Sequence, residues 1–312
     1  MRYLVRHRTT YSYLQDVSHS QHLLHLEPRA TPRQSVESVA VRVTPEPAER
    51  VRRADAFGNM AEWLTLDETH ETLEILAESH VTVAPTAPPD AAASLPWEQV
   101  TRLLEAPSDA DSREAVTYLF DSPFTWFTAD LAGYTRPSFP PGRPFLAGSV
   151  DLMRRIHRDF RYDTTVTDVT TPVDRVFEIR AGVCQDLAHL AIACLRSLGL
   201  PARYVSGYLL TRPAPGKEKL QGADASHAWF AVWAPPFGWV DLDPTNDLLP
   251  GEEHVTVGWG RDYGDVCPIN GVVVGGGDHG IDVGVDVVPE EGLPSRHPRA
   301  CPEGPFIRPR RR

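Results

Sequence analysis

One helix followed by three strands, between Cys184 and Asp243, constrains the fold of this chain most. Apolar residues recur at helical spacing from Cys184 to Leu198, and Gly199 and Pro201 follow as stop signals. Strand patterns then cover residues 202–210, 228–233 and 238–243. A helix followed by a sheet of consecutive strands predicts an α+β fold, with the helix packed on an antiparallel sheet.

Residues 1–84 predict a separate, mostly β domain. Short runs rich in β-branched and aromatic residues alternate there with polar residues. Residues 71–77 would also fit a helix, but their alternation favours a strand in this setting. The predicted strands include residues 3–5, 39–43, 61–66, 71–77 and 80–83.

The rest of the chain divides into three parts. Residues 85–96 are rich in proline and alanine and predict a linker. Residues 97–290 form the predicted second domain, with helices over 112–120 and 150–160 and further β-structure over 272–288. Residues 291–312 are rich in proline and arginine and predict a loose tail.

Composition excludes several classes of protein. The formal charge of −11 gives no basic footprint for nucleic acid or an anionic membrane. No apolar run approaches the roughly 20 residues of a membrane span, and Met1–His7 shows no secretory signal. Four cysteines are too few for a disulfide scaffold in 312 residues. We therefore expect a cytoplasmic protein with free thiols.

Cys184 is the candidate nucleophile. It opens the helix, where unpaired backbone N–H groups and the helix dipole favour a thiolate over a thiol. The alternative is a buried structural cysteine, and that is the role we expect for Cys194, which lies on the apolar stripe of the same helix.

His227 and Asp243 are the candidate base and its orienting carboxylate. His227 begins a strand after a polar loop, so its ring can face the helix start and take the thiol proton. Asp243 ends the next strand and can stabilise a charged His227. Asp241 lies on the same strand face and remains an alternative. His189 lies on the helix about 140° from Cys184, so we expect it to be structural.

An oxyanion hole needs two donors, and a metal site needs converging ligands. The backbone N–H of Cys184 is one donor, and the second candidates are the side chains of Gln185, Trp229 and Trp239. The spacing of His19, His22 and His25 alternates between strand faces and predicts no metal site. The three glycines at 275–277 lack the lysine of a phosphate-binding loop.

These segments resemble the bacterial transglutaminase-like superfamily, whose catalytic core is papain-like. The similar stretches are residues 180–189, 202–208, 227–229 and 243–245. The resemblance extends outward to residues 55–59 and 260–266. The resemblance covers roughly residues 1–290 and implies a β domain ahead of the core. It implies that Cys184, His227 and Asp243 form a catalytic triad, with no metal or organic cofactor.

The resemblance further implies a transglutaminase-like cysteine peptidase or amidohydrolase. Such an enzyme transfers an acyl group from a peptide or protein amide through a thioester. Water as acceptor gives hydrolysis of a peptide or isopeptide bond, which we expect here. The alternatives are amine transfer to protein glutamine by a transglutaminase, and a non-catalytic binding or scaffold protein with a vestigial triad.

Overall fold

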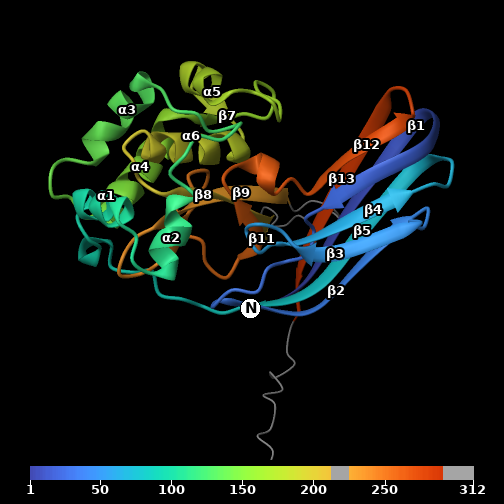
Figure 1. Ribbon diagram of the computed structural model, residues 1–312, viewed down its shortest axis with the longest axis horizontal. Coiled ribbons are helices and arrows are strands. Elements are labelled where there is room, and N and C mark those ends of the chain that lie inside the picture. The colour runs from blue at the N-terminus through green and yellow to red at the C-terminus, as the bar shows by residue number, and fades with distance from the viewer. Residues whose placement is uncertain (212–224, 291–312) are drawn as a thin grey trace, which may run out of the picture.

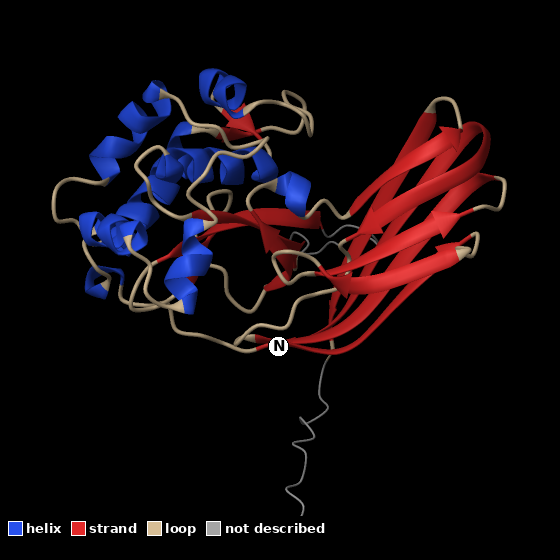
Figure 2. Ribbon diagram, viewed as in Figure 1, coloured by secondary structure: helices blue, strands red, loops and turns tan. Residues whose placement is uncertain are grey.

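The computed structural model describes residues 1–211 and 225–290, which form two lobes (Figure 1). One lobe consists of strands, and the other combines helices with a smaller sheet (Figure 2). The α+β prediction with a β domain at the N-terminus is confirmed. None of the helices in the described ranges has the length and apolar character needed to cross a membrane.

The N-terminal lobe is built around the 23-residue strand β1 (Arg2–Leu24). The first half of β1 pairs with β5 and its second half with β4, giving the strand order β2-β5-β1-β4-β3. Alternating residues of β5 from Leu73 to Val83 are buried, as expected for a strand with one face in a core. The other strands of this series are β2 (Gln34–Thr44), β3 (Glu49–Ala54), β4 (Met60–Leu66) and β5 (His70–Val83).

The last two strands also belong to the N-terminal lobe. β12 (Ile269–Gly275) and β13 (His279–Pro289) both pair antiparallel with β1. The boundary predicted for the second domain, residues 97–290, therefore includes two strands whose hydrogen bonds lie in the first. Because these pairings join residues more than 200 positions apart, strand patterns in the sequence could not reveal them. The predicted tail, 291–312, lies outside the described residues.

The second lobe, called here the core lobe, has a four-stranded antiparallel sheet in the order β10-β9-β8-β11. Its strands are β8 (Ala202–Leu209), β9 (Ala225–Trp233), β10 (Trp239–Leu242) and β11 (His254–Gly260), with a short parallel pair, β6 (Arg161–Tyr162) and β7 (Ala181–Gly182). The helices are α1 (Trp97–Glu105), α2 (Ala110–Val116), α3 (Ala129–Thr135), α4 (Phe145–Asp159), α5 (Val173–Ile179) and α6 (Cys184–Arg196), with 3-10 turns η1 (Ala91–Ala93), η2 (Arg136–Ser138) and η3 (Tyr263–Asp265).

Helix α6 is the centre of this lobe. Every residue from Asp186 to Arg196 is buried, and the helix packs against the sheet and against α3, α4 and α5. Gly199 has a positive φ of 69°, which supports its predicted role after the helix end. The helix predicted over 112–120 is shorter, because the carbonyl of Tyr118 turns away to accept from the Arg196 guanidinium at 2.9 Å.

Two side-chain amides from the N-terminal lobe bind the outermost described strand of the core sheet, β11. Gln34 Nε2 donates to the carbonyl of Thr256 at 2.6 Å, and the Thr256 N–H donates to Gln34 Oε1 at 2.8 Å. Asn59 Nδ2 donates to the carbonyl of Trp259 at 2.8 Å and its Oδ1 accepts from the Trp259 N–H at 3.0 Å. Each side-chain amide thus makes the two main-chain hydrogen bonds that a residue of a neighbouring strand would otherwise make with β11.

Candidate functional site

The start of α6 is held in a tight turn around Cys184. The carboxylate of Asp186 accepts hydrogen bonds from the backbone N–H of Val183 at 2.8 Å and from Thr167 Oγ1 at 2.7 Å. A Cβ on Gly182 would lie 2.5 Å from Asp186 Oδ2, so only glycine fits there. This arrangement presents the half-buried Cys184 at the first turn, beside unpaired backbone N–H groups.

His227 and Asp243 lie together at neighbouring strand ends. His227 is near the start of β9, and Asp243 directly follows β10. His227 Nε2 lies 2.7 Å from Asp243 Oδ2, and the two side chains are 6% and 0% exposed. A carboxylate only accepts, so His227 must carry its proton on Nε2 and leave Nδ1 for other partners.

The His227 ring also interacts with the Cys184 thiol. Burial lowers the pKa of His227, but hydrogen bonds to Asp243 and Cys184 outweigh it and raise this pKa to about 10. Since Nε2 is taken by Asp243, Nδ1 is the ring nitrogen that interacts with the thiol. The structure therefore brings together all three residues that the sequence singled out, in the order thiol, imidazole, carboxylate.

Asp243 has more partners than the sequence indicated. The backbone N–H groups of Thr245 and Asn246 donate to Oδ1 at 2.9 and 3.2 Å. Oδ2 also accepts from Asn246 Nδ2 at 2.7 Å and lies 3.1 Å from His254 Nε2. Burial raises the pKa of Asp243, yet hydrogen bonds from His227, His254 and Asn246 hold it well below its usual range.

Sequence reasoning missed Asn246 and His254. The position of Asn246, three residues after Asp243 in a turn, is a signal for a side chain folding back on the carboxylate. His254 gave no such signal, because it reaches Asp243 only through the register of β8 with β11.

The two alternatives to these residues have other partners. The Asp241 carboxylate lies 3.8 Å from the Arg33 guanidinium and lines a cavity of about 630 Å³ between the lobes. His189 is buried, and its Nε2 accepts the backbone N–H of Tyr263 at 3.1 Å. Burial lowers the pKa of His189 to about 3, which suits a neutral, structural imidazole.

The candidates for a second oxyanion donor differ in their contacts. Gln185 Nε2 donates to the carbonyl of Val169 at 3.1 Å. The indole nitrogens of Trp229 and Trp239 are buried without a hydrogen-bond partner among the described residues. The backbone N–H of Cys184 remains the donor that the helix start itself supplies.

Two groups of histidines carry atoms that could bind a metal. His19 pairs with Asp67 at 2.7 Å in an exposed position, whereas His22 and His25 are buried. The ligand atoms of His227, Asp243 and His254 all lie within 4.8 Å of one another. Ligands of a tetrahedral zinc ion lie about 3.4 Å apart. The 2.7 Å separation of His227 from Asp243 is instead that of a charge-assisted hydrogen bond.

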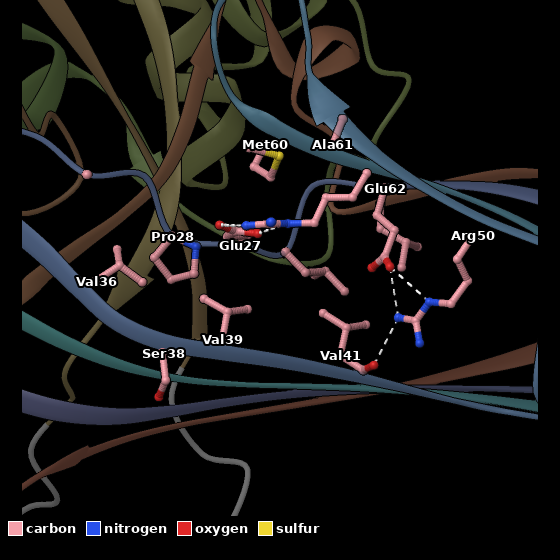
Figure 3. A pocket seen from close by; sticks show the side chains of 14 residues that line it. Glu27, Pro28, Val36, Ser38, Val39, Val41, Arg50, Met60, Ala61 and Glu62 are labelled. Carbon is pink, nitrogen blue, oxygen red and sulfur yellow. Dashed lines mark hydrogen bonds and ion pairs between the residues drawn. The ribbon is translucent and has the colours of Figure 1, made fainter.

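A separate hollow lies within the N-terminal lobe (Figure 3). It has a volume of about 570 Å³ and lies between β2 and the pair β3–β4, and its lining includes the apolar side chains of Val39, Val41 and Met60. Ion pairs of Arg50 with Glu62 and of Arg52 with Glu27 border it. Neither this hollow nor the cavity between the lobes is lined by Cys184, His227 or Asp243.

Comparisons with known proteins agree with this architecture. The profile of the bacterial transglutaminase-like N-terminal region matches residues 3–82, and that of the transglutaminase-like superfamily matches residues 143–244. An uncharacterized protein of Mycobacterium tuberculosis is 42% identical over 299 residues, covering 93% of this chain and 94% of the relative.

One further relative and one solved structure carry descriptions of an activity. A protein-glutamine gamma-glutamyltransferase of Pseudomonas aeruginosa is 36% identical over 104 residues, which are 32% of this chain and 15% of that protein. A solved structure from Cytophaga hutchinsonii, described as a candidate cysteine protease, has a TM-score of 0.71 at 21% identity and covers 94% of this chain and 93% of that one. That likeness shows a shared fold. The chain belongs to the transglutaminase-like superfamily, a family of thiol-dependent acyl transfer, and carries the bacterial N-terminal region of that family ahead of its core.

Proposed function

We propose that this protein hydrolyses peptide or isopeptide amides through a Cys184–His227–Asp243 triad. The observation that carries the proposal is the hydrogen bond from His227 Nε2 to a fully buried Asp243, which turns Nδ1 toward the thiol. A cysteine at a helix start, an imidazole facing it and a carboxylate behind the imidazole are the groups that acyl transfer through a thioester requires.

The proposed reaction has two halves. His227 takes the proton of the Cys184 thiol, and the thiolate sulfur attacks the amide carbonyl carbon. The carbonyl oxygen becomes an oxyanion, which the backbone N–H of Cys184 can stabilise. His227 returns the proton to the leaving amine, and an acyl thioester remains. His227 then deprotonates water, the hydroxide attacks the thioester, and the sulfur leaves as thiolate with release of the acid.

Amine transfer is the second candidate, because the Pseudomonas aeruginosa relative is described as a protein-glutamine gamma-glutamyltransferase. The first half of that reaction is the same, and a primary amine replaces water as the acceptor of the acyl group. The two functions therefore differ only in what attacks the thioester. A non-catalytic scaffold is the third candidate, in which the thiol has ordinary reactivity.

The test uses the full-length protein and its Cys184→Ala variant on panels of peptide and isopeptide substrates, with a primary amine in excess. Mass spectrometry distinguishes hydrolysis, which adds water to the acyl product, from incorporation of the amine. We expect hydrolysis that the Cys184→Ala variant lacks. Amine incorporation in preference to hydrolysis would establish transfer instead.

A substrate-free measurement separates an enzyme from a scaffold. The rate of iodoacetamide alkylation, resolved by site, is recorded for Cys184 as a function of pH in wild type and in His227→Ala. We expect rapid labelling below about pH 7 that the variant loses. Labelling that rises only near the pKa of an ordinary thiol, about 8.5, would favour the scaffold.

A further inference from the structure

A second histidine contacts the carboxylate of Asp243. His254 is the first residue of β11 and is 3% exposed. Its Nε2 lies 3.1 Å from Asp243 Oδ2, and its ring packs edge-on against Trp229 with centroids 5.3 Å apart. The ring centroid lies 5.9 Å from that of His227, so the two imidazoles share one carboxylate oxygen without stacking on each other.

Of the two ring nitrogens of His254, only Nε2 has a hydrogen-bond partner among the described residues. Because a carboxylate only accepts, the Nε2 atom of His254 must carry a proton and donate it to Asp243. His254 Nδ1 is buried and has no hydrogen-bond partner among the described residues. A buried polar nitrogen without a partner destabilises a fold, and an apolar side chain of similar size would fill the space without that cost. The donor bond to Asp243 is therefore the feature that distinguishes histidine from leucine at this position.

The carboxylate of Asp243 is surrounded by donors. His227 on β9, His254 on β11 and Asn246 in the turn after β10 all face Oδ2. Two backbone N–H groups face Oδ1. Five donors from three parts of the core lobe fix the rotation of the carboxylate group, and so fix the direction in which it holds His227.

We propose that His254 is a positioning residue: it holds the carboxylate of Asp243 in the rotation that directs Oδ2 at His227. The N-terminal lobe contributes, because Gln34 and Asn59 bind the main chain of β11 and so help to fix the strand that carries His254. This inference rests on the proposed function, since it assigns a role within the same triad. His254 itself transfers no proton to substrate.

The experiment compares His254→Gln with His254→Leu in the full-length protein, and His254→Met serves as a second apolar variant. Glutamine can place an amide N–H near the position of Nε2, whereas leucine has similar bulk and no donor. His70→Leu is the matched control, because His70 is a buried histidine of the N-terminal lobe. The measurement is the pH profile of Cys184 alkylation by iodoacetamide, together with thermal melting to confirm folding.

We expect His254→Leu to slow alkylation at pH 6 by about tenfold and to move the rise of the profile to higher pH. Tenfold is the low end of the effect of one hydrogen bond to an ionised group, because four other donors remain. The alkylation rate of His254→Gln should stay within about threefold of the wild-type rate. His70→Leu should label at the wild-type rate.

Three results would overturn the proposal. A folded His254→Leu protein with the wild-type profile would show that the donor does nothing. A His254→Gln protein as slow as His254→Leu would indicate that shape rather than hydrogen bonding matters. If His254→Leu and His254→Met both fail to fold while His254→Gln folds, the role is structural. Failure of the proposed function looks different, because the wild type itself would then lack rapid labelling at low pH.

Discussion

Replacing Asp243 with asparagine tests the charge that this carboxylate supplies. The oxygen of an asparagine can accept the two backbone N–H groups that now bind Oδ1. The amide nitrogen would then take the place of Oδ2 and face the Nε2 atoms of His227 and His254. An N–H group set against another N–H group drives the His227 proton onto Nδ1, the atom that faces Cys184. The substitution therefore removes the base as well as the charge.

The size of the effect follows from the pKa of His227. A pKa of about 10 in place of 6.5 favours the imidazolium by roughly 5 kcal/mol. Hydrogen bonds to Asp243 and to Cys184 share this amount, so we take the contribution of Asp243 as about 2 kcal/mol. That energy corresponds to roughly a 30-fold change in the population of the thiolate–imidazolium pair.

The assay is alkylation of Cys184 at pH 6 in Asp243→Asn, with Asp241→Asn as the matched control. Asp241 lies two residues earlier and pairs with Arg33 rather than with His227. We expect roughly 30-fold slower labelling in Asp243→Asn and the wild-type rate in Asp241→Asn. Equal rates in the two variants would refute the argument that Asp243 polarises His227.

Two other predictions follow from the same region. Gly182→Ala should lower the melting temperature and slow Cys184 labelling, because the new Cβ would lie 2.5 Å from Asp186 Oδ2; Gly251→Ala, where a Cβ meets nothing within 4 Å, is the control. The lowered pKa of Asp243 means that its contribution to stability is full above the unfolded pKa of about 3.9 and is lost as the pH falls below it. Urea unfolding at pH 5 and pH 3 should therefore show a larger loss of stability for wild type than for Asp243→Asn.

The sequence predicted the parts of the site that depend on local pattern. The apolar stripe of α6 and the strand patterns after it located Cys184, His227 and the strand end that carries Asp241 and Asp243. The choice of Asp243 over Asp241 came from the family resemblance. The order of β8, β9 and β10 follows from the tendency of consecutive strands to lie side by side in a sheet.

What the sequence could not predict depends on contacts between distant segments. His254 reaches Asp243 through strand register, and the pattern His254–Val257 resembles any half-buried strand. β12 and β13 pair with β1, from which most of the chain separates them in sequence. Their alternating pattern therefore predicted two strands but could not show which strand they pair with. The shortened α2 depends on a buried arginine, Arg196, whose guanidinium binds the carbonyl of Tyr118 from another helix.

The amide contacts of Gln34 and Asn59 with β11 have a consequence for dissecting the chain. An unpaired strand edge offers N–H and C=O groups to any other extended chain and so promotes aggregation. Here the main-chain groups of Thr256 and Trp259 are already occupied by the two side-chain amides. A fragment lacking the N-terminal lobe would leave this edge open to a second copy of itself. Insolubility of such a fragment would therefore reflect loss of a cover for the sheet, and would carry no information about the chemistry of Cys184.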